Sequence, residues 1–411
     1  YLLFIIFCCL ANLAVAESKT VSGTKPKDND LLALGIEELM KIEVTSVSRR
    51  SQKLSEVSSA IFVITQDDIR RSGATSIPEA LRMAPGVEVA RLGTDKWSIS
   101  VRGFNGRFAN KLQVLMDGRS VYTPLFSGVI WSQQDTFMED IERIEVIRGP
   151  GATVWGANAV NGVINIITKK AADTQGILLT SGGGSFERGF VGVRYGGKFN
   201  EETPFRIYAK AFSRDPMSSL SGANVKDDWQ SVRAGFRLDH SRGIDQLTVQ
   251  GDIFINRIGD SLLQPSLAAP FTRFEIADAK EIGGNIRLRW DRNFSDKSSI
   301  MLQTYYDRVH NQLAPWTKYA ESFDVDFQHR LPLLTHHDVT WGINYRLYNN
   351  NVPATELTVF TPHQKTNHNI SAFVRDEITL LPDQLRLSLG TRIDHNDFTG
   401  LEVQPSGRLM W

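Results

Sequence analysis

Apolar and polar residues alternate along most of the chain after residue 176. The stretch 339–347 is typical, because apolar Val339, Trp341 and Ile343 are separated by Thr340 and Gly342. Successive side chains of a β-strand point to opposite faces, so this period of two predicts strands with one apolar face. About twelve strands are predicted, including those near 188–198, 205–213, 232–239, 246–257, 282–292, 299–310, 322–330, 339–347, 367–379, 385–394 and 403–411.

The links between these strands separate two architectures. Alternation by itself also fits a soluble β-sandwich. Here short and long links alternate, which is typical of an antiparallel membrane barrel with tight turns at one end and loops at the other. Short turns are predicted near 197–204, 240–245, 293–298, 331–335 and 381–384. Longer loops are predicted near 214–228, 259–280, 311–321 and 349–366.

The pattern from about 57 to 170 is different and predicts a compact α/β unit. A helix is expected after Ser76 as N-cap, with Pro78 in its first turn, ending at Pro85 and Gly86. Short strands follow, and the last two flank a corridor of small residues. Within it, Gly149, Pro150 and Gly151 predict a sharp turn. Close backbone approach is expected at Gly156, Ala157, Asn158, Ala159 and Gly162.

The sizes of the two units do not match if the chain is complete. Twelve strands would close into a cylinder only ~24 Å across. A unit of ~115 residues is ~35 Å across, so it fits only inside a barrel of about twenty-two strands. Either the α/β unit lies outside a small barrel, or the sequence is a fragment holding about half of a large one.

The N-terminus predicts export. Residues 1–16 form an apolar run that ends in Ala14-Val15-Ala16, as in a secretory signal peptide. The alternative is a buried helix of the mature protein. Both cysteines, Cys8 and Cys9, lie in this run, so no disulfide or thiolate metal site is expected after cleavage. Residues 17–41 are expected to form a flexible arm.

Composition and motifs exclude several functions. The chain has 46 basic and 46 acidic residues, which argues against a nucleic-acid partner. It lacks the phosphate-binding, HExxH and GxSxG motifs, and His363 and His368 alone are weak evidence for a metal. We therefore expect no enzyme activity, no cofactor and no resident metal.

An ordered set of motifs resembles the plug domain of TonB-dependent outer-membrane receptors. These motifs are PGV, VRG, LMDG, IEVIRGP and WGANAVNGVINIIT. The nearest resemblance is to the vitamin B12 and ferric-siderophore receptors. It implies a plug at 48–172 inside a transmembrane antiparallel barrel of about 22 strands, of which 173–411 is the N-terminal half. It also implies the outer membrane of a Gram-negative bacterium, with its lipid as a partner.

The resemblance further implies import of a scarce metal chelate, driven by the inner-membrane protein TonB and its proton-driven complex. TonB would bind a short box that maps onto Ile42, Glu43, Val44, Thr45, Ser46 and Val47. An extended segment of this kind can add to the edge of a partner's sheet. The alternative is a simple linker strand.

Two sets of plug residues are expected to have a function, one in locking the plug to the barrel and one in contacting the ligand. Arg102 and Arg148 look like the pair that locks the plug onto barrel carboxylates, with Glu145 as a nearby partner; alternatively they bind plug carbonyls. Ligand contact is expected on outward loops, where ordinary packing is the alternative. The candidates are Arg91, Trp97, Phe104, Asn105, Arg107, Phe108, Tyr122, Phe126 and Trp131.

Rival functions are a passive porin, a barrel enzyme and a signalling receptor. A lumen-filling domain argues against a porin, and the arm is too short to hold the extra domain of a signalling receptor. The ligand stays open among iron chelates, cobalamin, heme, nickel chelates and glycans.

Overall fold

A computed structural model describes residues 43–45, 52–53, 57, 59–123, 125–156, 158–218, 226–313, 316–355, 358–382 and 384–411. The predicted signal peptide, the arm and three box residues (Ile42, Ser46 and Val47) lie outside the described residues. Within the described part, no helix has the length and apolar character needed to cross a bilayer.

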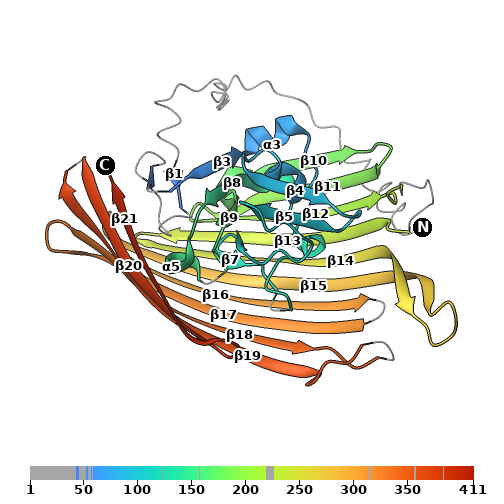
Figure 1. Ribbon diagram of the computed structural model, residues 1–411. Helices are drawn as coiled ribbons and strands as arrows, with labels where there is room; N and C mark the ends of the chain where they lie inside the picture. The colour runs from blue at the N-terminus through green and yellow to red at the C-terminus, as the bar shows by residue number, and fades with distance from the viewer. Residues whose placement is uncertain are drawn as a thin grey trace, which may run out of the picture.

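Twelve strands form one antiparallel sheet in sequence order, and Figure 1 shows this sheet curving around the N-terminal domain. The predicted strand number is therefore confirmed. The strands are β10 (Gly176–Gly182), β11 (Glu187–Asn200), β12 (Thr203–Arg214), β13 (Trp229–Arg242), β14 (Asp245–Pro265), β15 (Thr272–Ser295), β16 (Ser298–Leu313), β17 (Trp316–Leu333), β18 (His337–Asn351), β19 (Gln364–Leu381), β20 (Leu385–Asn396) and β21 (Gly400–Met410).

The two faces of this sheet differ as the alternation predicts. On β14, Ile253 is 68% exposed on the convex face, whereas the neighbouring Phe254 is 4% exposed on the concave face. Charged side chains such as Arg233 and Arg287 are also buried on the concave face. An apolar outer face and a polar inner face suit a wall between lipid and a wet lumen.

Two segments that were predicted as loops are mostly strand. Most of 259–280 is strand, because β14 runs to Pro265 and β15 begins at Thr272. Most of 311–321 is also strand, since β16 ends at Leu313 and β17 begins at Trp316. These hairpins keep pairing beyond the apolar band, where polar residues on both faces hide the period of two. Strand β10 was not located, because Ile177, Leu178 and Leu179 do not alternate.

The N-terminal domain, here called the plug, lies on the concave face (Figure 1). Its main sheet has the order β3-β8-β9-β6-β7, from β3 (Ile61–Thr65), β6 (Leu112–Met116), β7 (Arg119–Ser120), β8 (Ile141–Arg148) and β9 (Gly162–Thr168). Two further pairs are β1 (Glu43–Val44) with β2 (Gln52–Lys53), and β4 (Val87–Arg91) with β5 (Trp97–Val101). The helices are α3 (Gln66–Ser72), α4 (Ile77–Leu81) and α5 (Ala152–Trp155), with 3-10 turns η2 (Trp131–Gln133), η3 (Met138–Asp140) and η4 (Ala171–Thr174).

Local signals explain the plug helices. Thr65 and Asp68 form a reciprocal capping box at the start of α3, and Gly73 ends that helix in the left-handed conformation. Ser76 is the N-cap of α4 and a proline occupies its first turn, as predicted, although the Ser76 side chain makes no capping bond. Ile64, Ile69, Ile77 and Leu81 pack into the same buried core.

The small-residue corridor allows the close packing that was predicted. A Cβ added at Gly162 would lie 2.4 Å from the Ile147 carbonyl oxygen on the neighbouring strand. Ala157 lies outside the described residues.

We expect Gly162→Ala to destabilise the plug by about 1–3 kcal/mol, because backbone atoms must move apart to admit the methyl group. Denaturant unfolding of the plug measures this loss. Gly106→Ala is the matched control, since an added Cβ there meets no atom within 4 Å. Equal midpoints for the two variants would contradict the prediction.

Candidate functional site

The twelve-stranded sheet, here called the wall, has two ends. The plug contacts the wall at both of them. The turn end carries the links 201–202, 243–244 and 296–297, and the loop end carries the link 266–271. We describe the seam between plug and wall from the turn end to the loop end.

A buried carboxylate of the plug lies between two arginines of the wall at the turn end. Asp140, at the end of η3, is 1% exposed. Its Oδ1 accepts from Arg194 Nη1 at 2.7 Å, and its Oδ2 lies 3.2 Å from Arg206 Nε. These arginines come from β11 and β12, so one plug side chain binds two wall strands.

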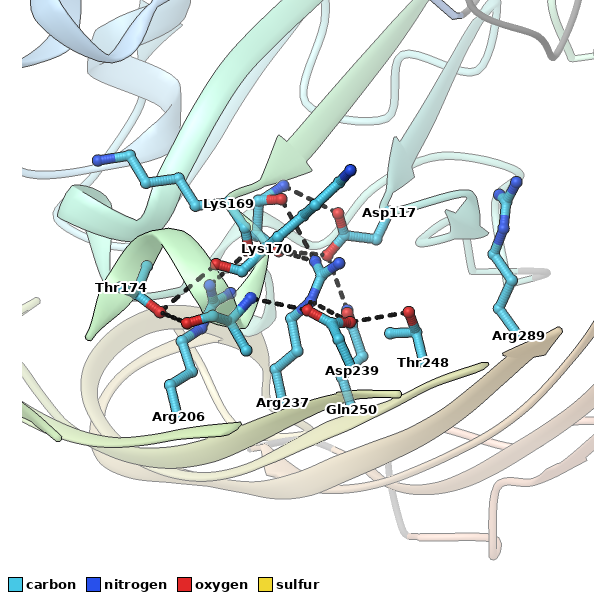
Figure 2. A network of polar contacts seen from close by, with 12 residues as sticks. Asp117, Lys169, Lys170, Thr174, Arg206, Arg237, Asp239, Thr248, Gln250 and Arg289 are labelled. Carbon is cyan, nitrogen blue, oxygen red and sulfur yellow. Dashed lines mark hydrogen bonds and ion pairs between the residues drawn. The ribbon is translucent and has the colours of Figure 1, made fainter. Parts of the chain in front are cut away.

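A second network extends from Asp117, as Figure 2 shows. Asp117 accepts from Thr168 N at 2.8 Å and from Gln250 Nε2 of the wall at 2.7 Å. Arg237 of the wall donates to Thr168 Oγ1 at 3.0 Å and also pairs with Asp239. Burial alone would raise the pKa of the Asp117 carboxyl, but Arg287 and Arg237 hold this pKa below its usual range.

The Asp239 carboxylate extends this network to the start of the wall. It accepts from Ala171 N at 2.7 Å and from Thr248 Oγ1 at 2.8 Å. Arg206 donates to the Lys169 carbonyl at 2.5 Å (Figure 2). The segment that joins plug to wall is therefore itself fixed to the wall.

Nearer the loop end, plug polar groups insert between wall side chains. Glu281, which is 3% exposed, accepts from Ser132 Oγ and Gln133 Nε2 of the plug, each at 3.0 Å. Further ion pairs join Asp135 to Lys210 at 2.7 Å, Lys96 to Asp260 at 2.7 Å, and Arg119 to Asp307. The seam is thus built largely from buried hydrogen bonds and ion pairs, and the loss of one partner in such a contact leaves a costly unpaired group.

Several cavities lie between the described parts of plug and wall, and two of them are larger than the rest that are described. One of about 280 Å³ lies toward the loop end, between the plug and β17–β21, and is lined by Tyr122, Asp324, Arg346 and Arg392 among others. Another of about 530 Å³ lies at the turn end, beside Thr45, Arg143 and Asp239.

The described residues of the predicted box, Glu43, Val44 and Thr45, lie at the turn end. Val44 is 1% exposed. Thr45 N lies 3.1 and 3.0 Å from the two carboxylate oxygens of Glu145, whose side chain has no exposed surface. Arg143 Nε also donates to Glu145 at 2.9 Å. Residues 43–45 are therefore docked against the plug sheet in this structure.

Comparison with known proteins decides the family. The family described as "TonB-dependent Receptor Plug Domain" matches residues 53–163. The family described as "TonB dependent receptor-like, beta-barrel" matches residues 171–411, more than half of the chain. The chain belongs to the TonB-dependent receptor family.

Curated relatives resemble this receptor over part of its length. A vitamin B12 transporter BtuB of Vibrio vulnificus is 35% identical over 144 residues, covering 34% of this chain and 23% of the transporter. One of Vibrio cholerae is 28% identical over 198 residues, covering 48% of this chain and 31% of the transporter. The matches thus cover less than a third of each transporter.

Solved structures share the fold. The ferripyoverdine receptor of the outer membrane of Pseudomonas aeruginosa has a TM-score of 0.65 and 16% identity, covering 89% of this chain and 56% of that receptor. The siderophore receptor PirA of Acinetobacter baumannii has a TM-score of 0.66 and 19% identity, covering 85% of this chain and 59% of that receptor. The chain thus corresponds to somewhat over half of each receptor.

The plug-and-barrel fold and the receptor family agree with the sequence-based predictions.

The predicted lock residues of the receptor have other neighbours. Arg148 Nη1 donates to the Pro85 carbonyl at 3.2 Å, which is the alternative that the sequence left open. Arg102 is exposed in a left-handed conformation with a φ of 60°. Glu145 and Arg148 are three residues apart on β8 and so face opposite sides of it. Among the described residues, the plug–wall ion pairs at the turn end join one plug carboxylate, Asp140, to Arg194 and Arg206 of the wall, a polarity opposite to the predicted one.

Two predicted ligand residues lie in the plug core. Trp97 and Trp131 are 4% and 7% exposed within the main plug core. Arg91 covers Trp97, with its guanidinium carbon 4.8 Å from the Trp97 ring and 4.2 Å from the Phe186 ring. A tryptophan in a turn-rich segment looks like a ligand contact in sequence, but here the small plug uses it to fill its interior.

The other candidates are more accessible. Phe104 and Phe108 are 76% and 60% exposed. Phe108 packs edge-to-face on Phe126 with 5.0 Å between ring centroids, and Arg107 lies over Phe108. Asn105 accepts a hydrogen bond from Ser98. Tyr122 lines the 280 Å³ cavity and packs edge-to-face on Tyr348 of the wall.

Sequence reasoning missed the residues of the seam itself. Asp117 belongs to the LMDG motif, but Asp135 and Asp140 stand in no motif. The only available signal was the charge on the inward positions of the strands. This charge indicates that these side chains need polar partners, but it does not identify the partners.

The plug loop at Asp95 makes stability depend on pH. Burial raises the pKa of the Asp95 carboxyl to about 7. The positive charge of Lys96 opposes this rise in pKa, whereas the negative charges of Glu281 and Asp260 add to it. The Asp95 carboxyl of the unfolded chain has an ordinary pKa of 3.8, so it loses its proton at a lower pH than the folded form does. Stability is therefore greatest below that value and falls as pH rises to about 7.

We expect Asp95→Asn to flatten this dependence, so that its melting temperature exceeds that of the wild type by more at pH 8 than at pH 5. Thermal unfolding at both pH values measures the difference. Asp173→Asn, at an exposed position, is the control. A difference independent of pH would contradict the assignment.

Proposed function

We propose that this receptor imports a scarce metal chelate across the outer membrane by TonB-dependent movement of its plug. The supporting observation is that the plug lies against the concave face of the wall through polar contacts, with residues 43–45 of the predicted box docked at the turn end. Ligand would bind at the loop end, and TonB would take up the box at the turn end. A passive pore has no use for such a domain.

We propose the domain limits 1–16 for the signal peptide, 17–41 for the arm, 42–47 for the box, 48–172 for the plug and 173–411 for the half-barrel. The two family matches, 53–163 and 171–411, are compatible with the last two limits. No resident cofactor is proposed.

Cobalamin is the first ligand to test, because the curated relatives named above are vitamin B12 transporters. A ferric siderophore is the second. The solved siderophore receptors are under 25% identical to this chain, so they support the fold rather than the ligand. Heme, a glycan or a mainly signalling role are the remaining alternatives.

The test expresses the complete gene in cells that lack their own receptors for these ligands. Uptake of labelled cobalamin and of ⁵⁵Fe-siderophores is compared with and without TonB. Uptake of one ligand only with TonB is the expected result. Equal uptake without TonB would overturn the proposed mechanism, and binding of a ligand that is never taken up would favour a signalling receptor.

A further inference from the structure

The cavity of about 280 Å³ toward the loop end combines aromatic rings with many amide side chains. Trp155 and Tyr122 of the plug line it, and the Tyr122 ring packs edge-to-face on Tyr348 of the wall with 5.8 Å between ring centroids. Rings beside amides suit a ligand that has both an apolar face and hydrogen-bonding groups. The amide residues of the lining are Gln113, Asn158, Asn344, Asn367, Asn369 and Asn396.

The two arginines that line this cavity are already paired within the wall. Arg346 Nε donates to Asp324 at 2.6 Å, and Arg392 Nε donates to Asp394 at 2.9 Å. The plug also covers Arg392, because a Cβ added at Gly156 would lie 3.6 Å from its Nη2. Both carboxylates are buried. An anionic ligand would therefore have to displace a buried carboxylate to reach either guanidinium.

The remaining charges of the lining are negative. Among its described residues, the other formally charged ones are the acids Asp326 and Glu402. Glu402 lies on β21 and accepts a hydrogen bond from Thr399 at the loop end. Lys365 lies outside the lining, where its Nζ is 4.4 Å from the centroid of the Phe398 ring. The described lining thus offers hydrogen-bond acceptors, and each of its arginines has a carboxylate partner.

Two amide oxygens of the lining lack a donor. Oδ1 of Asn367 and Oδ1 of Asn369 have no hydrogen-bond partner among the described residues. Both residues occupy inward positions of β19, and Asn367 is buried. A buried acceptor without a donor is destabilising, so N–H or O–H groups of a ligand fit this lining better than further acceptors do.

We propose that this cavity is a ligand subsite for an uncharged chelate rich in amide N–H or hydroxyl groups, and that it discriminates against anionic chelates. The inference rests on the proposed import function and names the class of ligand. At about 280 Å³ the cavity takes one edge of a large chelate, since a whole small-molecule site has roughly 300–1,000 Å³. It shares Gly118, Trp155 and Asp326 with the cavity at the turn end, so a ligand edge bound here lies next to that second cavity.

The experiment measures equilibrium binding to the full-length receptor in neutral detergent, with two matched pairs of probes. One pair is cyanocobalamin and its derivative in which one side-chain amide is hydrolysed to a carboxylate. The other is a ferric tris-hydroxamate chelate whose free amine is either acetylated or succinylated, so that only the second form gains a carboxylate. Glu402→Lys places a cation in the lining, and Glu201→Lys makes the same change of charge at an 89% exposed side chain of the turn end. The thermal midpoint of each variant verifies folding.

In the wild type, the uncharged member of at least one pair is expected to bind about tenfold more tightly than the carboxylate member, the effect of one charge in a partly desolvated site. Glu402→Lys should lose this preference, and Glu201→Lys should keep it. Equal binding of both members in the wild type would overturn the proposal. So would a preference for the carboxylate member, a preference that Glu402→Lys retains, or the absence of binding by every probe.

Failure of the import function gives a different result. Uptake of both members of the preferred pair is measured in cells with and without TonB. Uptake that is independent of TonB would overturn the import mechanism and leave the binding preference in place. TonB-dependent uptake of both members, together with equal binding, would overturn the ligand class and leave the import mechanism in place.

Discussion

Asp140→Asn is expected to release the plug from the wall at the turn end. The substitution removes the charge that two buried arginines share, and their side chains are only 10% and 5% exposed. Breaking a buried pair by removing one partner costs about 3–5 kcal/mol, because the remaining charges stay desolvated. Hydrogen exchange of residues 138–148 should therefore become about a hundredfold faster or more.

The control for this prediction is Asp173→Asn, which removes the same charge at an exposed position of η4 nearby. Its exchange should match that of the wild type. If Asp140→Asn left exchange in η3 and β8 unchanged, Asp140 would not be an anchor, and the seam would depend on the Asp117 network instead.

Val44→Pro is expected to reduce TonB-dependent uptake about tenfold or more while ligand binding stays unchanged. Proline lacks the N–H group that strand addition to a partner sheet requires. Val44 pairs with Gln52 in this structure, so it already adopts the extended backbone that a partner would use. Uptake and equilibrium binding of the same labelled ligand, measured on the same cells, separate the two effects.

Val44→Ile keeps the backbone donor and the extended conformation, and should transport normally. A loss of binding in Val44→Pro would indicate that the substitution disturbs the plug itself, because Val44 is buried against it. Normal uptake by Val44→Pro would place the partner-binding segment elsewhere in the chain.

The alternation of apolar and polar residues was sufficient to predict the architecture. A period of two is a local property, since each strand must present one apolar face to lipid whatever its neighbours are. The corridor around Gly162 was likewise readable, because only glycine permits that backbone approach. The ordered plug motifs likewise allowed the family to be predicted from the sequence. The ends of the strands were not readable, because hairpins beyond the lipid lose the apolar period while their backbone pairing continues.

The contacts between individual plug and wall residues became known only from the tertiary structure. Asp117 reaches Gln250, and Asp140 reaches Arg194 and Arg206, across long separations in sequence. Local patterns record that a side chain is polar and faces inward, but its partner depends on how the plug is rotated within the wall. The same reason explains Trp97 and Trp131, whose burial follows from packing between strands that are distant in sequence.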